Sequence, residues 1–413
     1  MKKIAIIGGG AAGLMAAARI MELSSSHEIF LIERNKILGK KVIISGGGRC
    51  NLTTGLDDLK EILKKYPRGP RFLRTAMYAF PPVKMREWMQ DHGVPIKIEE
   101  DMRVFPKSDN GMHVVRAFET FLKKSGVQIL FETALESVKK EGDKFVLSFD
   151  GRENLLVDKL ILAPGGQAYR HTGSKGDGYS FAESLGHNIT ALGPSLNAFV
   201  LAEKWIAELS GLSFKNVALS FRGKEKFTFT GPIMLTHKGI TGPAVFALSA
   251  YSSYEKFDVN KPAKLFVDFF PEKNHEELQG EFSKELDANL KKSFNNILSR
   301  FVPRSFAEII CKQLSVDPKK ISVELSKKDL NKVIDALKNM SFTIIGRSAG
   351  DEFVTAGGVD LSEVSAKTME SKICSGLYFA GEILDYDGFT GGFNLQAAWA
   401  SGRLAGENAA TVP

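Results

Sequence analysis

The first 33 residues contain the pattern that most restricts the fold of this chain. An apolar stretch at 4–7 runs into the turn Gly-Gly-Gly-Ala-Ala-Gly at 8–13, an alanine-rich run follows, and a second apolar stretch at 29–32 ends at Glu33. A strand, a Gly-x-Gly-x-x-Gly turn, a helix and a second strand ending in an acid form the signature of a Rossmann unit. We therefore predict an α/β fold that binds FAD or NAD near its N-terminus.

Each residue of this signature has a physical task. Gly8 allows the tight turn, Gly10 lets a pyrophosphate approach the backbone, and Gly13 lets the helix pack closely on the strand. The start of the helix offers unpaired N–H groups and the positive end of its dipole to the phosphates. Glu33, twenty residues after Gly13, stands where a carboxylate accepts hydrogen bonds from a ribose diol.

Further glycine clusters distinguish FAD from NAD. They occur at 39–48, at 165–166 after an apolar strand at 159–163, at 381 after another strand, and at 391–392. An NAD domain completes its site within a local fold, whereas FAD enzymes of the glutathione-reductase type bring a C-terminal segment back to the cofactor. Clusters this far apart in the sequence therefore favour FAD.

Five longer strings carry a family resemblance. They are SGGGRCN at 45–51, GSKGDGYSFAESLGH at 173–187, THKGITGPA at 236–244, TAGGVDL at 355–361 and TMESKICSGLYFAGEILDYDGFTGGFNLQAAWASG at 368–402. With them the chain resembles, nearly end to end, the BaiN/YhiN-like flavoproteins, which are bacterial FAD-dependent oxidoreductases that include proteins described as aminoacetone oxidases. The resemblance implies a glutathione-reductase-like FAD-binding Rossmann domain interrupted by a β-barrel and a helical subdomain. Glu382 departs from the wider superfamily, which has Asp there, and Lys175 stands where a small polar residue is expected.

The pattern along the chain changes in the way an interrupted domain requires. Helix and strand signals alternate up to residue 190, short apolar runs with turns follow from about 195, and helical periodicity dominates from 274 to 339. Within the last stretch, 326–329 resembles a helix cap. We expect an FAD-binding domain at 1–190 and 345–413, a β-barrel-like insert at 191–271 and 340–344, and a helical subdomain at 272–339.

The residues expected to hold FAD lie in the glycine clusters or beside them. A helix that starts near Asn394 would direct its N-terminus at the electron-rich end of the flavin, and Arg49 would bind either a cofactor phosphate or a substrate carboxylate. The predicted contacts are Gly8, Gly10, Ala11, Ala12, Gly13, Glu33, Arg34, Lys40, Lys41, Ser45, Gly46, Gly47, Arg49, Cys50, Asn51, Ala134, Ala163, Gly165, Gly166, Gly381, Glu382, Gly392, Asn394, Leu395 and Gln396.

Candidate catalytic groups are few. We expect the flavin ring to be bounded by the turn at 45–51, by 385–393 and by the strand that ends at His237, each of which joins an apolar strand to glycines. His237 is a candidate general acid or base, because its ordinary pKa suits pH 7; the alternative is a strand-end histidine bonded to backbone. Cys50 is either a redox thiol or a small buried residue beside the cofactor. The three acidic and phenolic groups at 385–387 border the flavin or form a solvated turn.

Composition removes several other classes of protein. The three cysteines form no CxxC pair and no ligand-spaced cluster with the seven histidines, which argues against a disulfide reductase and against a metal site. No stretch is apolar for long enough to span a bilayer, and the N-terminal apolar run is a fingerprint rather than a signal peptide, so we expect a cytoplasmic protein without a membrane partner. The net charge of +7 is modest for 413 residues and gives little support for nucleic acid. The oligomeric state stays open.

Three hypotheses for the function follow. The first is hydride transfer between FAD and a small organic substrate: oxidation of an amine or amino-ketone by oxygen, or reduction of an activated C=C bond driven by NAD(P)H. The chain has no second dinucleotide fingerprint, so NAD(P)H would dock transiently as electron donor.

The second hypothesis is an FAD-dependent protein that modifies or binds RNA, with the helical subdomain as contact surface. Acids such as Glu276 and Glu281 dilute the lysine pairs of that subdomain at 291–292, 319–320 and 327–328. The third is a flavin-binding protein without turnover. Neither the substrate nor the direction of electron flow can be read from the sequence.

Overall fold

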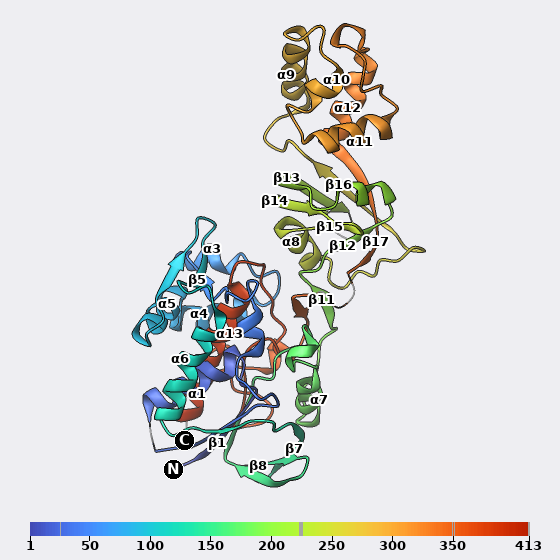
Figure 1. Ribbon diagram of the computed structural model, residues 1–413. Helices are drawn as coiled ribbons and strands as arrows, with labels where there is room; N and C mark the ends of the chain where they lie inside the picture. Colours follow the sequence, from blue (N-terminus) through green and yellow to red (C-terminus); the bar gives the residue numbers. More distant parts are fainter. Residues whose placement is uncertain (25, 223–225, 349, 351, 412–413) are drawn as a thin grey trace. The chain divides into compact units, whose positions relative to one another are not determined.

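The chain forms two compact units, one of which is inserted into the other. A computed structural model describes residues 1–24, 26–222, 226–348, 350 and 352–411. The first unit consists of Met1–Ser195 with Gly350–Pro413, and the second of Leu196–Ala349. Figure 1 shows the elements of each unit.

A five-stranded parallel sheet organises the first unit. Its strand order is β19-β10-β1-β2-β6, so the central strand β1 pairs with two strands that are remote from each other in sequence. Strands β1, β2, β10 and β19 are short, apolar and almost fully buried, as expected when both faces of a parallel sheet are covered, whereas the edge strand β6 is partly exposed. Their bounds are β1 (Lys3–Ile7), β2 (Glu28–Ile32), β6 (Gln128–Leu130), β10 (Lys159–Leu162) and β19 (Leu377–Phe379).

Two helices from opposite ends of the chain pack closely in this unit. They are α1 (Ala11–Leu23) and α13 (Phe393–Thr411). A Cβ added to Gly402 would lie 2.2 Å from the carbonyl oxygen of Ala12, and one added to Gly406 would lie 2.4 Å from that of Ala16. The glycines of α13 therefore set the spacing between the helices and hold the C-terminal segment against the fingerprint helix.

Smaller elements complete the first unit. One prediction was wrong here: the stretch before Ser45 is a helix, α2, because Gly39 in a left-handed conformation lets the Ile43 N–H bond to its carbonyl at 2.9 Å. The smaller helices are α2 (Lys40–Ile44), α3 (Leu59–Leu63), α4 (Pro70–Ala79), α5 (Pro82–Asp91), α6 (Gly111–Lys124) and α7 (Asp177–Ser184). One three-stranded sheet has the order β3 (Thr53–Thr54), β5 (Arg103–Pro106), β4 (Ile96–Ile98), and a second has the order β7 (Leu135–Glu141), β8 (Lys144–Phe149), β9 (Arg152–Val157). The strands β11 (Gly193–Ser195) and β18 (Val354–Ala356) form a two-stranded sheet.

The second unit has a closed barrel, a helical part and a hydrophobic core of its own. Ser326 caps α12 by accepting a hydrogen bond from the Asp329 N–H, as predicted. The barrel order is β12 (Phe199–Leu201), β15 (Gly239–Thr241), β14 (Lys226–Leu235), β13 (Ser213–Arg222), β16 (Ala263–Asp268), β17 (Met340–Arg347). The helices are α8 (Pro243–Tyr251), α9 (His275–Asp287), α10 (Phe294–Leu298), α11 (Arg304–Leu314) and α12 (Lys327–Asn339). Among the helices described, none combines the length and apolar character that crossing a bilayer requires.

The glycine-mediated contact of α1 with α13 can be tested by adding one methyl group. We expect Gly406→Ala to lower the free energy of unfolding by about 1–3 kcal/mol, because the new Cβ overlaps the backbone of Ala16. Gly280→Ala is the matched control, since Gly280 lies exposed in α9 with open space in front of it; it should gain about 0.4–1 kcal/mol. Urea unfolding of both variants checks this, and equal stabilities would contradict it.

Candidate functional site

The predicted glycine clusters meet at one edge of the parallel sheet. Gly8 follows β1 and donates its N–H to Ile32 at the end of β2 (2.8 Å), while Ala163 at the end of β10 donates to Ile7 (2.9 Å). Gly381 follows β19 in the same way. In doubly wound sheets, ligands bind outside the carboxyl ends of the strands, so this edge is the candidate site.

Three glycines of the fingerprint have three different surroundings. Gly8 has φ +101°, and a Cβ there would lie 2.5 Å from the carbonyl oxygen of Ala163. A Cβ on Gly13 would lie 1.9 Å from the oxygen of Gly8, so helix and strand could not pack as they do. Gly10 has nothing within 4 Å of its added Cβ, and as N-cap of α1 it gives the helix no side-chain cap. The N–H groups of Ala11 and Ala12 thus begin an uncapped helix next to open space, which suits a pyrophosphate.

Glu33 is fixed at the end of β2 by backbone and side-chain donors. The carboxylate is 7% exposed; its Oε2 accepts from the Gly9 N–H at 2.9 Å, and its Oε1 accepts from Asn35 N (2.8 Å) and Nδ2 (2.7 Å). Because a carboxylate offers about four lone-pair sites, these three bonds leave room for a ribose hydroxyl. Glu33 therefore fits the predicted role.

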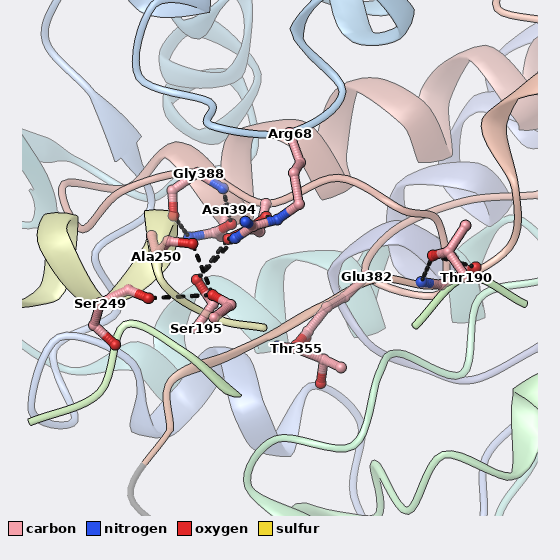
Figure 2. Close-up of polar contacts among 12 residues, drawn as sticks. Arg68, Thr190, Ser195, Ser249, Ala250, Thr355, Glu382, Gly388 and Asn394 are labelled. Atoms are coloured by element: carbon pink, nitrogen blue, oxygen red, sulfur yellow. Dashed lines mark hydrogen bonds and ion pairs between the residues drawn. The ribbon is translucent and has the colours of Figure 1, made fainter. Parts of the chain in front are cut away.

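Glu382 joins three segments of the site. Its Oε2 lies 2.9 Å from Lys41 Nζ. Its Oε1 accepts from the Thr355 N–H at 2.9 Å; Glu382 and Thr355 are labelled in Figure 2. The Thr355 hydroxyl in turn accepts from the N–H groups of Gln167 (2.9 Å) and Ala168 (3.1 Å), next to the Gly165–Gly166 turn. Glutamate at this position thus connects α2, β18 and the turn after β10.

The loop at 45–51 has an unusual backbone. Gly46, Gly47 and Gly48 all lie in the left-handed region, and a Cβ on Gly47 or Gly48 would meet nothing within 4 Å. Ser45 closes the loop, since its carbonyl accepts from the Cys50 N–H at 2.9 Å, and its hydroxyl donates to the Val42 carbonyl in α2 (2.8 Å). In the orientation of its side-chain amide that satisfies both Thr53 and Gly392, Asn51 donates to the Thr53 carbonyl at 3.3 Å and accepts from the Gly392 N–H at 3.0 Å. The loop therefore presents open backbone next to the start of α13.

All four predicted cationic contacts are engaged with protein groups. Arg49 donates to Glu99 Oε1 at 2.7 Å, lies 3.6 Å from Asp109 Oδ1 and has its guanidinium 3.8 Å from the Phe105 ring centre. Its hydrogen bond to Glu99 raises the pKa of Arg49. Arg34 pairs with Asp177 and donates to the Gly173 carbonyl at 3.3 Å, and Lys40 donates to the His171 carbonyl at 2.8 Å. Lys41 is bound by Glu382, as described above.

The predicted polar residues at the start of α13 hold the helix in place. Asn394 accepts from the Gly388 N–H at 2.8 Å and donates to its carbonyl at 2.7 Å (Figure 2). Gln396 is fully buried and bonds to Thr53 Oγ1 (2.7 Å) and to the Phe80 carbonyl (2.8 Å). Gly392 packs against Thr53, and Leu395 packs on the hydrophobic core. A Cβ added to Gly381 would lie 2.9 Å from the Cβ of Ala12, so a larger residue would not fit there. Ala134 is exposed.

A buried ion pair lies just after Glu382, where the sequence left a solvated turn open. Asp387 is completely buried; its Oδ2 is 2.5 Å from Arg68 Nη2 and accepts from the Ser195 hydroxyl at 2.6 Å (Figure 2). Burial raises the pKa of Asp387, and the Arg68 guanidinium opposes that shift. Tyr386 is 2% exposed, so the segment is part of the interior. Arg68 was missed because no motif surrounds it.

Asp385 is the acid in this segment that the fold leaves incompletely bonded. It is half-buried, and its Oδ1 has no hydrogen-bond partner among the described residues. Burial raises the pKa of the Asp385 carboxyl, and the nearby Thr190 hydroxyl and Arg68 guanidinium oppose that shift. The buried Tyr179 hydroxyl in the same unit also finds no partner within the described part of the chain. Since buried polar groups are normally hydrogen-bonded, both atoms are suited to a bound polar group.

The two candidate catalytic residues differ in exposure. Cys50 is completely buried with φ +62°, and burial raises the pKa of its thiol to about 12. The thiol is therefore protonated at neutral pH, which favours its reading as a small buried residue. His237 is exposed in the turn between β14 and β15, next to the hydrogen bond from the Thr236 N–H to the Gly239 carbonyl (2.8 Å). Its role remains a prediction.

The sequence matches the HI0933-like protein Rossmann domain over residues 2–408. The chain belongs to the HI0933-like family. It is 31% identical over 415 residues to the 3-dehydro-bile acid delta(4,6)-reductase of Clostridium scindens, with all of both chains covered. It is also 31% identical over 405 residues to the ribosomal RNA dihydrouridine synthase of Haemophilus influenzae, covering 96% of this chain and 95% of that one. The predicted flavoprotein family is confirmed, and with it an FAD-dependent oxidoreductase.

Solved structures agree on the fold of the family. A 3-ketosteroid delta1-dehydrogenase from Sterolibacterium denitrificans superposes with a TM-score of 0.51 at 12% identity, covering all of both chains. At this identity the likeness concerns the fold alone. Together with the parallel sheet and the closed barrel described above, it confirms the predicted fold class.

Replacement of Glu33 tests the cofactor site. We expect Glu33→Ala to weaken FAD binding at least about tenfold, because a carboxylate that accepts from ribose hydroxyls makes charge-assisted bonds of roughly 1.5–3 kcal/mol each. Glu136→Ala, which removes an exposed carboxylate from β7, is the control. Titration of the apoprotein with FAD, followed by fluorescence, gives both dissociation constants. An unchanged constant for Glu33→Ala would assign the ribose contact to another residue.

Proposed function

We propose that this protein uses FAD and NAD(P)H to reduce a carbon–carbon double bond that is conjugated to a carbonyl group. The supporting observation is that two full-length relatives are named for that same bond chemistry. One name specifies the 4,6-diene of a 3-oxo bile acid, and the other the conversion of uridine to dihydrouridine, in which the double bond next to a ring carbonyl is saturated. Of the two forms of hydride transfer raised by the sequence, this favours reduction over amine oxidation.

The proposed reaction balances with one nicotinamide per double bond. The carbon β to the carbonyl gains a hydride, the α carbon gains a proton, and NAD(P)H becomes NAD(P)⁺. Bound FAD supplies the relay of the hydride from nicotinamide to substrate. The chain must therefore bind FAD, admit a nicotinamide and a substrate, and deliver one proton.

Residues of the sheet edge would carry the first task. The uncapped start of α1 and the open face of Gly10 would receive the pyrophosphate, and Glu33 a ribose. The loop at 45–51 offers backbone that a flat ring system can approach, and the start of α13 places the positive end of a helix dipole beside that loop. Asn394 and Gln396 hold that helix end in position.

Asp385 is the proton donor that the first unit offers best. Its carboxyl is half-buried, keeps an oxygen without a hydrogen-bond partner among the described residues, and has a raised pKa. A carboxyl with a raised pKa retains its proton closer to neutral pH, as a general acid must. The second unit would contribute substrate recognition, and there His237 is the competing candidate for proton transfer.

Anaerobic stopped-flow spectroscopy tests the reaction itself. We expect NADH or NADPH to bleach the flavin absorbance of the purified protein, and a 3-oxo-4-ene steroid or a uridine-containing RNA to restore it without oxygen. The conjugated carbonyl makes either acceptor reactive toward hydride. Bleaching by small amines, with no recovery on adding either acceptor, would favour amine oxidation instead. A flavin that neither nicotinamides nor amines reduce would indicate a binding protein without turnover.

Single substitutions separate the two candidate proton donors. We expect Asp385→Asn to slow the reoxidation of the flavin by the acceptor about 10²–10⁴-fold, the usual contribution of a general acid, at unchanged FAD occupancy. In the parent protein, this rate should fall as pH rises through the raised pKa of Asp385, and the variant should lack that fall. His237→Ala should keep both the rate and the pH profile. The opposite pattern would assign proton transfer to His237.

A further inference from the structure

Three lysine pairs that are separate in the sequence lie together in the second unit. The segments 289–294 and 317–324 run side by side: the Phe294 N–H donates to the Lys320 carbonyl at 2.8 Å, the Ser322 N–H donates to the Lys292 carbonyl at 3.1 Å, and Ser293 forms a β-bridge with Ile321. The first two lysine pairs, 291–292 and 319–320, are carried by these bonded segments.

The third pair, Lys327 and Lys328, follows at once as the first turn of α12. We call these six residues the lysine surface; they are Lys291, Lys292, Lys319, Lys320, Lys327 and Lys328. All are exposed except Lys320, which is half-buried and lies 3.5 Å from Asp329. Lysine in the first turn of a helix faces the positive end of the helix dipole and disfavours folding slightly, so the pair at 327–328 does not serve the stability of α12.

Three acids of α9 are engaged with other groups, whereas Asp287 at its end is exposed. On α9, Glu281 pairs with Lys273 (2.5 Å), Glu285 pairs with Arg300, and Glu277 completes a capping box. Asp317 and Glu324 are the exposed acids within the two bonded segments. The second unit as a whole has 23 Lys and Arg against 17 Asp and Glu, so it carries +6 of the net charge of +7. Positive charge is therefore concentrated in this unit.

We propose that the lysine surface binds the phosphate backbone of a structured RNA. This inference rests on the proposed function, because it names RNA as the polymer that presents the reducible uracil. Lysine is a point charge that contacts phosphate without reading base sequence, and the surface contains no aromatic side chain on which bases could stack. The lysine surface would therefore position the RNA, and another part of the protein would select the base. Two relatives from different organisms are named as ribosomal RNA dihydrouridine synthases.

Matched quadruple variants of the FAD-loaded, full-length protein test this proposal. One variant, K291Q/K292Q/K327Q/K328Q, removes four charges from the lysine surface. The control, K107Q/K124Q/K139Q/K367Q, removes four exposed lysines from the first unit. The probe is a fluorescently labelled stem–loop RNA that contains uridines and is transcribed in vitro, with affinity measured by anisotropy at several salt concentrations. We expect the first variant to bind at least about tenfold more weakly and to lose about 0.7–0.9 of salt slope per phosphate contact, and the control to match the parent protein.

Three outcomes would overturn the proposal. These are unchanged RNA affinity in the first variant, an equal loss in the control, or tighter binding of the parent protein to polyglutamate or to anionic vesicles than to RNA. Reduction of a 3-oxo-4-ene steroid, measured on the same preparations, should be unchanged in both variants. If neither the steroid nor a uridine-containing RNA reoxidises the reduced flavin of any preparation while RNA binding depends on the lysine surface, the proposed reaction fails and the RNA surface stands.

Discussion

The contact between α1 and α13 is the constraint on which the site depends. The two helices come from opposite ends of the chain, and glycine at 402 and 406 lets their backbones approach to distances that any Cβ would prevent. This contact places the segment after β19 beside the fingerprint helix, where a Cβ on Gly381 would lie 2.9 Å from that of Ala12, and Glu382 follows next to the Gly165–Gly166 turn. A site assembled from both ends of a chain exists only when the whole first unit is folded.

The sequence predicted those parts of the site that a local pattern requires. Gly8, Gly10 and Gly13 lie in a short motif whose geometry demands glycine, and Glu33 follows at a fixed distance, so each could be assigned a task in advance. The left-handed backbone of 46–48 was not predicted, because consecutive glycines permit that conformation without requiring it. The helical state of 40–44 did not follow, because a short apolar run has no period that separates helix from strand.

The buried polar residues could not be predicted, since their partners are distant in sequence. Arg68 meets Asp387 across more than three hundred residues, and neither position has a neighbour that marks it as charged and buried. From the sequence, Arg49 was predicted to bind a cofactor phosphate or a substrate carboxylate, and the pairing of Arg49 with Glu99 and Asp109 could not be foreseen. Asp385 and Asp387 are two residues apart, yet one is fully paired and the other keeps an unbonded oxygen. Only the tertiary structure separates a structural acid from a candidate proton donor.

The antiparallel pair β11 and β18 has a consequence for how this family diversifies. Ser195 lies opposite Val354 in that pair, and the whole second unit is threaded between these two neighbouring strands. The two connections between the units therefore start at neighbouring positions of one antiparallel strand pair. A lobe attached in this way can be lengthened, shortened or exchanged during evolution while the residues of the sheet edge stay untouched. The alignments with relatives named for a bile acid and for a ribosomal RNA span at least 95% of each relative, so the inserted lobe is kept at full length while the substrates in the names differ.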